Sequence, residues 1–261
     1  MIEEIKNRLL EQNKNWLAII TGGTGSGKSW SALRLAEMID PDFNITKVCF
    51  TSKDFMKTLN SDKIKKGACI VFDEAGVGIP SREWYSVSNK LINYVLQTFR
   101  HRNLAVIFTT PSFEFIDSQA RKLFHFYFET MKIYRRAGVC ILKPLMIQHN
   151  PRLGKTYFKY PEYPEGLLKR LKVHKPSHEL IMAYERKKKL FSKKLGEDIE
   201  ETLAAASEKE RKSKPLTDEE CIKIIKKKLK GEKVTASKIR SVVPVSYHRA
   251  EELRDKIKRT Y

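Results

Sequence analysis

Two stretches of this sequence contain residue types that could bind a nucleoside triphosphate and its metal ion. The first follows the apolar run 16–20 and precedes a segment whose apolar residues have helical spacing. Its pattern is one glycine, four further residues and then Gly-Lys-Ser, which is the spacing of a P-loop. The loop consists of Gly22, Gly23, Thr24, Gly25, Ser26, Gly27, Lys28 and Ser29.

Each residue type in this loop has a mechanical role. Glycines allow backbone angles that other residues avoid, so that successive N–H groups can point inward around phosphate oxygens. We expect Lys28 to reach the β- and γ-phosphates and Ser29 to ligate Mg²⁺. The alternative is a flexible glycine loop with a chance Gly-Lys-Ser, which would not need a strand before it and a helix after it. The loop therefore predicts a site for ATP and Mg²⁺.

The second stretch, Gly67–Asp73, reads GACIVFD and is followed by Glu74. Its apolar residues predict a buried strand, and open α/β sheets bind ligands at the carboxyl ends of their strands. We expect Asp73 to lie in the Mg²⁺ shell and Glu74 to polarise the attacking water. An Asp-Glu pair after an apolar run is common by chance, so its position downstream of a P-loop carries the functional interpretation.

A third stretch places two arginines, Arg100 and Arg102, directly before the apolar run Leu104–Thr110. In a ring of subunits, an arginine at this position would enter a neighbour's site and neutralise charge on the transferred phosphoryl group. The sequence does not choose between the two arginines, and the alternative is a solvent-exposed basic turn. At the end of the run, Thr110 is the expected contact for the γ-phosphate or the attacking water.

The pattern of apolar residues predicts the elements that position these groups. We expect an α/β P-loop NTPase core with a mainly parallel sheet, of the additional-strand, Asp-Glu type. The predicted strands of the core cover 16–20, 45–51, 67–73, 104–110 and 124–130, and the predicted helices cover 1–13, 30–39, 52–59, 79–99 and 113–123. Further strands with turns are expected over 132–160.

The second half of the chain is expected to be mainly helical. Residues 166–213 form a predicted helical linker region, with a long polar helix over 177–213, and residues 1–165 form the core with its β-rich extension. Three short helices over 214–261 suggest a helix-turn-helix or winged-helix module. Its last helix is expected to present four residues to DNA: Tyr247, His248, Arg249 and Arg254. A small helical bundle for protein contact is the alternative.

The composition points to a polyanionic partner. The chain has 51 lysines and arginines against 31 acidic residues, a net charge of +20, and 27 of the basic residues lie in 162–261. Such a balance favours double-stranded DNA as the partner. No apolar run approaches the roughly 18 residues of a membrane-spanning helix, and the N-terminus lacks the layout of a signal peptide. We therefore expect a cytoplasmic protein without a membrane segment.

Taken together, the motifs TGGTGSGKS, IVFDEAG, FRHRN before LAVIFTT, and FIDSQARKL resemble a known family. They look like the zonular occludens toxin-like branch of the HerA/FtsK superfamily of P-loop ATPases, over about residues 16–130. The resemblance implies ring-forming, often hexameric, ATP-driven machines that pump or thread DNA. Carried over to matching positions, it implies phosphate and Mg²⁺ binding by Lys28 and Ser29, metal and water roles for Asp73 and Glu74, and a trans role for Arg100 or Arg102.

The sequence departs from this family pattern in two places. The superfamily commonly has a glutamine where this chain has Thr110, and the phage members of the branch carry a membrane-spanning segment that is not found here. Toxin-like behaviour and membrane export are therefore not implied.

These patterns favour a Mg²⁺-dependent ATPase that acts on DNA, as an oligomeric motor or remodelling enzyme in packaging, transfer or segregation. An ATP-switched DNA-binding adaptor or loader, without processive translocation, is the alternative from a different functional class. A small-molecule kinase with the same P-loop is disfavoured because the +20 charge, the acidic pair and the two arginines would have no role.

Overall fold

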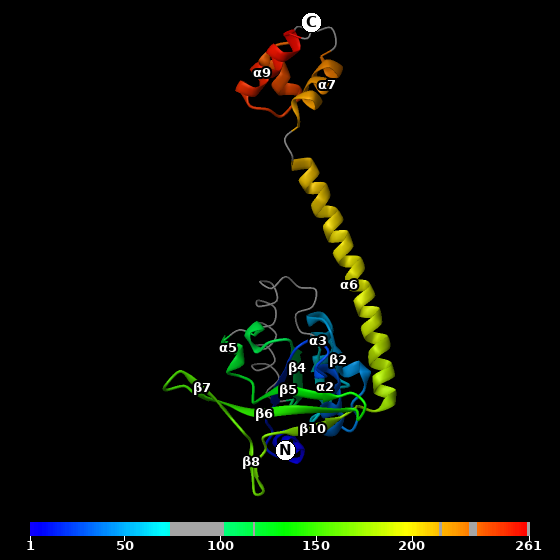
Figure 1. Cartoon of the computed structure of the whole chain (residues 1–261), viewed down its shortest axis with the longest axis vertical. Coiled ribbons are helices and arrows are strands. Elements are labelled where there is room, and N and C mark those ends of the chain that lie inside the picture. Colours follow the sequence, from blue (N-terminus) through cyan, green and yellow to red (C-terminus); the bar gives the residue numbers. More distant parts are fainter. Residues whose placement is uncertain (74–101, 117, 214–215, 230–233, 260–261) are drawn as a thin grey trace. The chain divides into compact units, whose positions relative to one another are not determined.

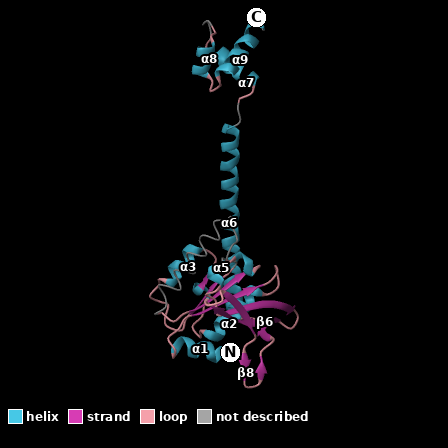
Figure 2. Ribbon diagram, turned by 90° about the vertical axis from the view of Figure 1, so that its left-hand side faces the viewer, coloured by secondary structure: helices cyan, strands magenta, loops and turns pink. Residues whose placement is uncertain are grey.

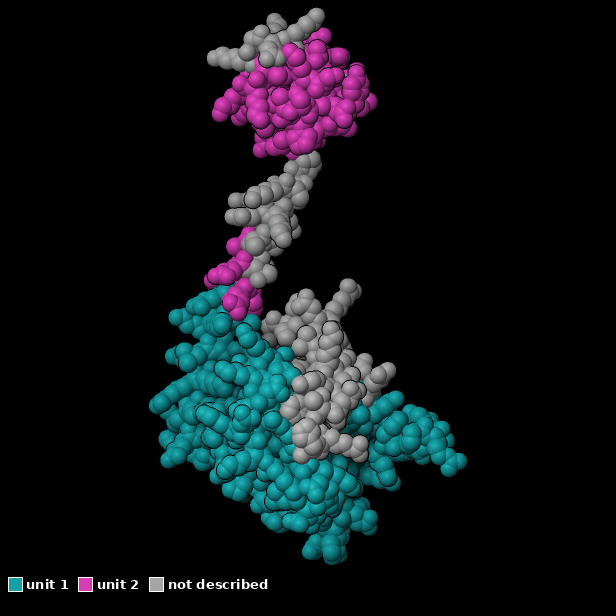
Figure 3. All heavy atoms as spheres, turned by 180° about the vertical axis from the view of Figure 1, so that it is seen from behind, with its two compact units in different colours: residues 1–197 teal, residues 198–261 magenta. Residues whose placement is uncertain are grey.

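The computed structural model describes residues 1–73, 102–116, 118–213, 216–229 and 234–259. The chain divides into two compact units, Met1–Glu197 and Asp198–Tyr261, which Figure 3 colours separately. The first unit reaches beyond the predicted core boundary at 165. The predicted helix over 79–99, together with Glu74 and Arg100, lies outside the described residues.

A large mixed sheet organises the first unit (Figure 1). Within the described residues, its strand order is β10-β6-β5-β1-β4-β3-β2, and β7 pairs with β6. The strands from β5 to β2 in this order run parallel, whereas β6, β7 and β10 add antiparallel pairs. The strands are β1 Trp16–Thr21, β2 Val48–Cys49, β3 Cys69–Phe72, β4 Ala105–Thr110, β5 Phe126–Tyr134, β6 Val139–Asn150, β7 Lys155–Lys159 and β10 Leu171–His174.

The position of β4 decides the fold class. This strand pairs in parallel with both β1 and β3, so it lies between the strand that enters the P-loop and the strand that ends at Asp73. That additional central strand is the feature predicted from the sequence. The α/β fold of a P-loop NTPase is therefore confirmed.

The sheet is buried on both faces, which explains why its central strands read as unbroken apolar runs. Alternate residues of β1 enter different cores: Ala18 and Ile20 pack with α1 and α2, whereas Leu17 and Ile19 pack with α3. The helices of this unit are α1 Ile2–Leu10, α2 Lys28–Ile39, α3 Ser52–Leu59, the short α5 Ser118–Arg121 and the first part of α6 His178–Ser213. Leu180 and Tyr184 of α6 join the core on the α2 face.

Three predicted elements differ from the structure. The predicted strand 45–51 is reduced to β2, because Asn44 accepts a hydrogen bond from the N–H of Thr46 and starts a 3-10 turn over Ile45–Lys47. The predicted helix 113–123 is a 3-10 turn, Phe113–Phe115, followed by α5. Residues 171–174 fall in the region predicted to be helical, yet they pair with β6 as β10.

Two hairpins extend beyond the packed sheet. One is formed by the distal part of β6 with β7, and the other by β8 Glu162–Tyr163 with β9 Gly166–Leu167. Figure 2 shows the β8–β9 hairpin projecting from the strand layer. The tyrosine hydroxyl of β8 donates a hydrogen bond to Glu4 on α1 over 2.9 Å, which links this hairpin to the N-terminal helix.

A buried ion pair fixes the end of the P-loop helix to the sheet. The ammonium of Lys47 lies 2.7 Å from the Asp40 carboxylate, and both side chains are more than nine-tenths buried. The same carboxylate accepts a hydrogen bond of 2.9 Å from the backbone N–H of Cys69 at the start of β3. Because these donors satisfy the buried charge, the chain can end α2 and turn at this point.

A partly buried histidine makes the stability of the first unit depend on pH. The Nδ1 atom of His125 accepts a hydrogen bond of 3.0 Å from the backbone N–H of Leu17, and its Nε2 atom lies 2.6 Å from the guanidinium of Arg8. Burial, with a smaller contribution from the charge of Arg8, lowers the pKa of His125 to about 4. The neutral imidazole is therefore the form that the fold accommodates.

Protonation of His125 should destabilise the first unit at acidic pH. Because the folded pKa of about 4 lies below the unfolded value of 6.5, the stabilisation is complete above pH 6.5 and is lost as the pH falls toward 4. The loss should reach about 3 kcal/mol of unfolding free energy. Denaturant titrations across this pH range should show it for the wild type and a much smaller loss for His125→Asn, whose amide does not titrate.

The second unit contains three short helices that pack on one another. They are α7 Asp218–Lys228, α8 Ala236–Val242 and α9 Tyr247–Arg259. A capping box starts α7: Thr217 accepts a hydrogen bond from the N–H of Glu220, and the Glu220 side chain accepts one from the N–H of Thr217. The buried residues of this unit are Cys221, Ile225, Ala236, Ile239, Val243, Ala250, Leu253 and Ile257.

Among all described residues, no helix is both long and apolar enough to cross a membrane.

Candidate nucleotide and metal site

The P-loop joins the end of β1 to the start of α2. Gly22, Gly25 and Gly27 have backbone φ angles of +148°, +72° and +95°, which residues with a Cβ atom rarely adopt. The loop can therefore turn tightly and place the first turn of α2 directly after Gly27. This arrangement points the positive end of the helix toward the loop.

The β5–β6 pair contacts the P-loop. The sequence did not predict these contacts. The hydroxyl of Thr130 on β5 donates to the carbonyl of Thr21 over 3.1 Å and lies 2.8 Å from the hydroxyl of Ser26. The thiol of Cys140 on β6 contacts the carbonyl of Ser26 at 3.5 Å. Neither residue belongs to a recognisable motif, so only the strand pairing of β1 with β5 identifies them.

Gly22→Ala should destabilise this part of the site. A Cβ at Gly22 would lie 1.8 Å from the Thr130 hydroxyl oxygen, and the φ of +148° disfavours any side chain. We expect a loss of about 1–3 kcal/mol from crowding and strain, seen as a melting temperature lower by about 2–12 °C. Gly23→Ala is the matched control, because its Cβ would meet no atom within 4 Å. Equal melting temperatures for the two variants would contradict the described loop geometry.

Lys28 and Ser29 lie together in the first turn of α2. The ammonium of Lys28 donates a 2.8 Å hydrogen bond to the carbonyl of Gly23, so the side chain reaches back across the loop, and only 9% of Lys28 is exposed. Both residues line the same cavity. In the P-loop pattern, these two positions are the ones that contact phosphate oxygens and the metal ion.

Asp73 lies at the carboxyl end of β3 and is completely buried. Its Oδ1 atom accepts a 2.6 Å hydrogen bond from the hydroxyl of Thr109 on β4, and its Oδ2 atom accepts a 2.6 Å hydrogen bond from the hydroxyl of Tyr184 on α6. The ammonium of Lys188 is 3.8 Å from Oδ2. Because Thr109 pairs with Ile20 of β1, this carboxylate and the P-loop lie at one edge of the sheet.

A cavity of about 830 Å³ is lined by residues of both the P-loop and α6. Its walls include Lys28 and Ser29 from the P-loop, and Tyr184 and Lys188 from α6. The opposite wall comes from the β5–β6 turn and β10, and consists of Ile133, Tyr134, Arg135, Gly138, Val139, Cys140, Val173, His174 and Lys175. Its size and mixture of apolar and charged walls suit a nucleotide.

The residues present fit ATP and Mg²⁺. The glycine-lined loop leaves its backbone free of Cβ atoms where a polyphosphate would lie. The serine hydroxyl and the carboxylate of Asp73 supply the oxygen donors that Mg²⁺ prefers. The described groups could thus hold a triphosphate and position its metal.

The other predicted catalytic residues have different positions. Thr110 is fully buried at the end of β4, lines the cavity, and donates to the carbonyl of Ser112 over 3.2 Å. Its neighbour Thr109 contacts Asp73 instead, which the sequence did not indicate. The guanidinium of Arg102 donates to the carbonyls of Leu59 and Ser61, at 2.9 and 3.2 Å, and so closes the end of α3. Those contacts lie within its own chain.

The four predicted DNA-contacting residues of α9 do not share one environment. Tyr247 is 54% exposed, and the exposed ring of His248 lies 3.3 Å from Glu252. Arg254 pairs with Asp255 at 2.9 Å. The Arg249 side chain is partly exposed, and its guanidinium donates to the carbonyl of Leu216 over 2.6 Å and pairs with Asp218. It ties α9 to the start of α7.

Comparisons with known proteins agree with the motifs. The zonular occludens toxin (Zot) family matches residues 34–141, a segment that begins within α2 and ends in β6. Among solved structures, the N-terminal domain of zonular occludens toxin from Neisseria meningitidis is similar, with 18% identity, 58% of this chain and 96% of that chain covered, and a TM-score of 0.34. No curated protein matches the sequence. The resemblance predicted from the sequence is confirmed: residues 34–141 are similar to the zonular occludens toxin family.

Proposed function

We propose that this protein is a Mg²⁺-dependent ATPase that acts on double-stranded DNA within an oligomeric motor or remodelling assembly. One observation carries the ATPase part of the proposal. Lys28 and Ser29 of the P-loop line one cavity together with Tyr184 and Lys188, the residues that contact the buried Asp73.

Each group has a role in the proposed reaction. Mg²⁺ would neutralise charge on the phosphate oxygens. Lys28 would bind the β- and γ-phosphates, and Ser29 and Asp73 would hold the metal in place. Glu74, which follows Asp73 in the sequence, would orient the attacking water, and Thr110 at the end of β4 would contact the γ-phosphate.

The trans arginine is proposed to be Arg100. The guanidinium of Arg102 already contacts two carbonyls at the end of α3 in its own chain, so its release toward a neighbour would leave those groups without these bonds. A ring of subunits, as the resemblance implies, would bring Arg100 to the adjacent site.

The DNA part of the proposal rests on charge. The chain carries a net +20, and the last turn of α7 holds Lys226, Lys227 and Lys228. In a helix-turn-helix module formed by α8 and α9, Tyr247, His248 and Arg254 would be the DNA contacts. Arg249 would contribute to the stability of the module through its bonds to α7.

ATP turnover, measured with and without duplex DNA alongside the solution mass, tests this proposal. Stimulation of turnover by DNA in an oligomer is the expected result. An inert monomer, with no turnover in either condition, would overturn it.

An ATP-switched DNA-binding adaptor is the second candidate. It is favoured by one observation: Tyr184 and Lys188, which contact Asp73, belong to α6, and this helix continues to Ser213 in the second unit. In such a protein, nucleotide binding would set the state of the DNA-binding unit. Slow turnover that does not respond to DNA, together with a sequence-specific footprint, would distinguish the adaptor from the motor.

A further inference from the structure

The first part of α6 contacts both halves of the candidate site. Near its start, the backbone N–H and hydroxyl of Ser177 donate hydrogen bonds to Glu37 on α2, the helix that begins at Lys28. Further along, Tyr184 and Lys188 reach Asp73 at the end of β3. One helix therefore contacts the P-loop helix and the metal-site carboxylate.

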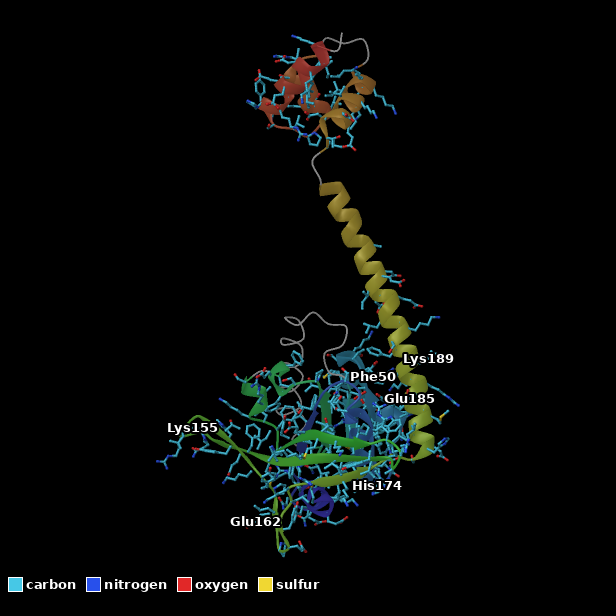
Figure 4. The ribbon with its side chains drawn as sticks, viewed as in Figure 1. Phe50, Lys155, Glu162, His174, Glu185 and Lys189 are labelled. Atoms are coloured by element: carbon cyan, nitrogen blue, oxygen red, sulfur yellow. The ribbon has the colours of Figure 1, made fainter. Side chains whose placement is uncertain are left out.

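Packing fixes this part of α6 on the core. The ring of Phe191 stacks on Phe50 with 5.0 Å between ring centroids, and the Tyr184 ring is tilted against Phe50 at 5.9 Å. The ammonium of Lys187 donates to the carbonyls of Ile45 and Val48. Figure 4 shows Phe50 beside α6, near Glu185 and Lys189. The hydroxyl of Tyr184 is thus held at a defined position.

The contacts around Asp73 form a short chain of donors and acceptors. Lys188 donates to the Tyr184 hydroxyl over 3.0 Å, and that hydroxyl donates to Oδ2 of Asp73 over 2.6 Å. The Asp73 side chain is fully buried, whereas 27% of the Lys188 side chain is exposed. A buried carboxylate requires hydrogen bonds and a nearby positive charge. Tyr184 and Thr109 donate the hydrogen bonds, and Lys188 supplies the positive charge.

We propose that Tyr184 and Lys188 are positioning residues of the metal site. Tyr184 fixes the orientation of the Asp73 carboxylate, and Lys188 provides the positive charge that Mg²⁺ provides when ATP is bound. The inference rests on the proposed ATPase function. Because two cations near one carboxylate repel each other, Lys188 weakens the binding of Mg²⁺. Tyr184 strengthens that binding, because it holds the carboxylate in one orientation. The two residues therefore affect the Mg²⁺ requirement in opposite directions.

A Mg²⁺ titration of nucleotide binding tests this inference without measuring hydrolysis. Binding of a fluorescent, non-hydrolysable ATP analogue is followed at fixed nucleotide concentration. Lys188→Met should lower the half-saturating Mg²⁺ concentration about fivefold, because a partly screened repulsion is removed. Tyr184→Phe keeps the ring but loses the hydroxyl, and should raise that concentration about fivefold.

Lys189→Met is the matched control, since it removes the same charge from the next position of α6, where the side chain is exposed. Its Mg²⁺ requirement should equal that of the wild type. In metal-free buffer, Lys188→Met should melt at a lower temperature than Lys189→Met, because Asp73 loses its nearby charge. Should Lys188→Met fail to fold, Lys188→Gln replaces it, with the same expected direction.

Two outcomes would overturn the inference. One is an equal Mg²⁺ requirement for the Lys188→Met and Lys189→Met variants. The other is a shift in the same direction for Tyr184→Phe and Lys188→Met, which general damage to the helix would produce. If the wild-type protein binds no nucleotide at any Mg²⁺ concentration, the proposed function itself fails, and this inference fails with it.

Discussion

Lys28→Ala should abolish ATP hydrolysis while leaving the fold intact. The ammonium of Lys28 donates a hydrogen bond to the carbonyl of Gly23 within its own loop. The lost group is the one expected to stabilise charge on the β- and γ-phosphates, and removal of such a donor costs about 100-fold or more in rate. Turnover and circular dichroism measured together would separate the two effects.

Lys53→Ala provides the control for this experiment, because Lys53 is exposed on α3. It removes the same charge from the net +20 and should retain full turnover. Normal hydrolysis by Lys28→Ala would refute the assignment of the P-loop.

Asp73→Ala should reduce both stability and activity. The substitution leaves the hydroxyls of Thr109 and Tyr184 without the acceptor that each now uses, and leaves Lys188 without its carboxylate. We expect a loss of about 3 kcal/mol, which corresponds to a melting temperature lower by about 6–12 °C. Hydrolysis should be lost because the metal has lost an oxygen donor.

Two further variants separate the causes of these losses. Asp73→Asn keeps the shape of the side chain and removes its charge. It should therefore be more stable than Asp73→Ala, yet equally inactive in hydrolysis. Asp62→Ala removes an exposed carboxylate and should change neither quantity. A stable Asp73→Ala variant would contradict the described hydrogen bonds.

The sequence predicted those parts of the site that depend on local patterns. The P-loop is one continuous segment, and the strand before Asp73 has an unbroken apolar run, so both were found from spacing alone. The additional strand was also predictable, because a buried parallel strand reads as a continuous apolar stretch. The capping box at Thr217 and Glu220 is likewise local, and it marks the start of α7.

The contacts that the sequence did not reveal join residues far apart in the chain. Tyr184 and Asp73 are separated by 111 positions, and no short motif encodes such a pairing. The partner of Asp73 on β4 shows a second limit, since adjacent residues of a strand point to opposite faces. Only the register of β4 against its neighbours places Thr109 at Asp73. The direction of Arg249 depends in the same way on how α9 packs against α7.

Calorimetric titration of the protein with a non-hydrolysable ATP analogue and Mg²⁺ tests the central claim most directly. The account predicts saturable binding at one site per chain, dependent on Mg²⁺ and lost in Lys28→Ala. An absence of binding by the wild-type protein, or equal binding by the Lys28→Ala variant, would contradict it.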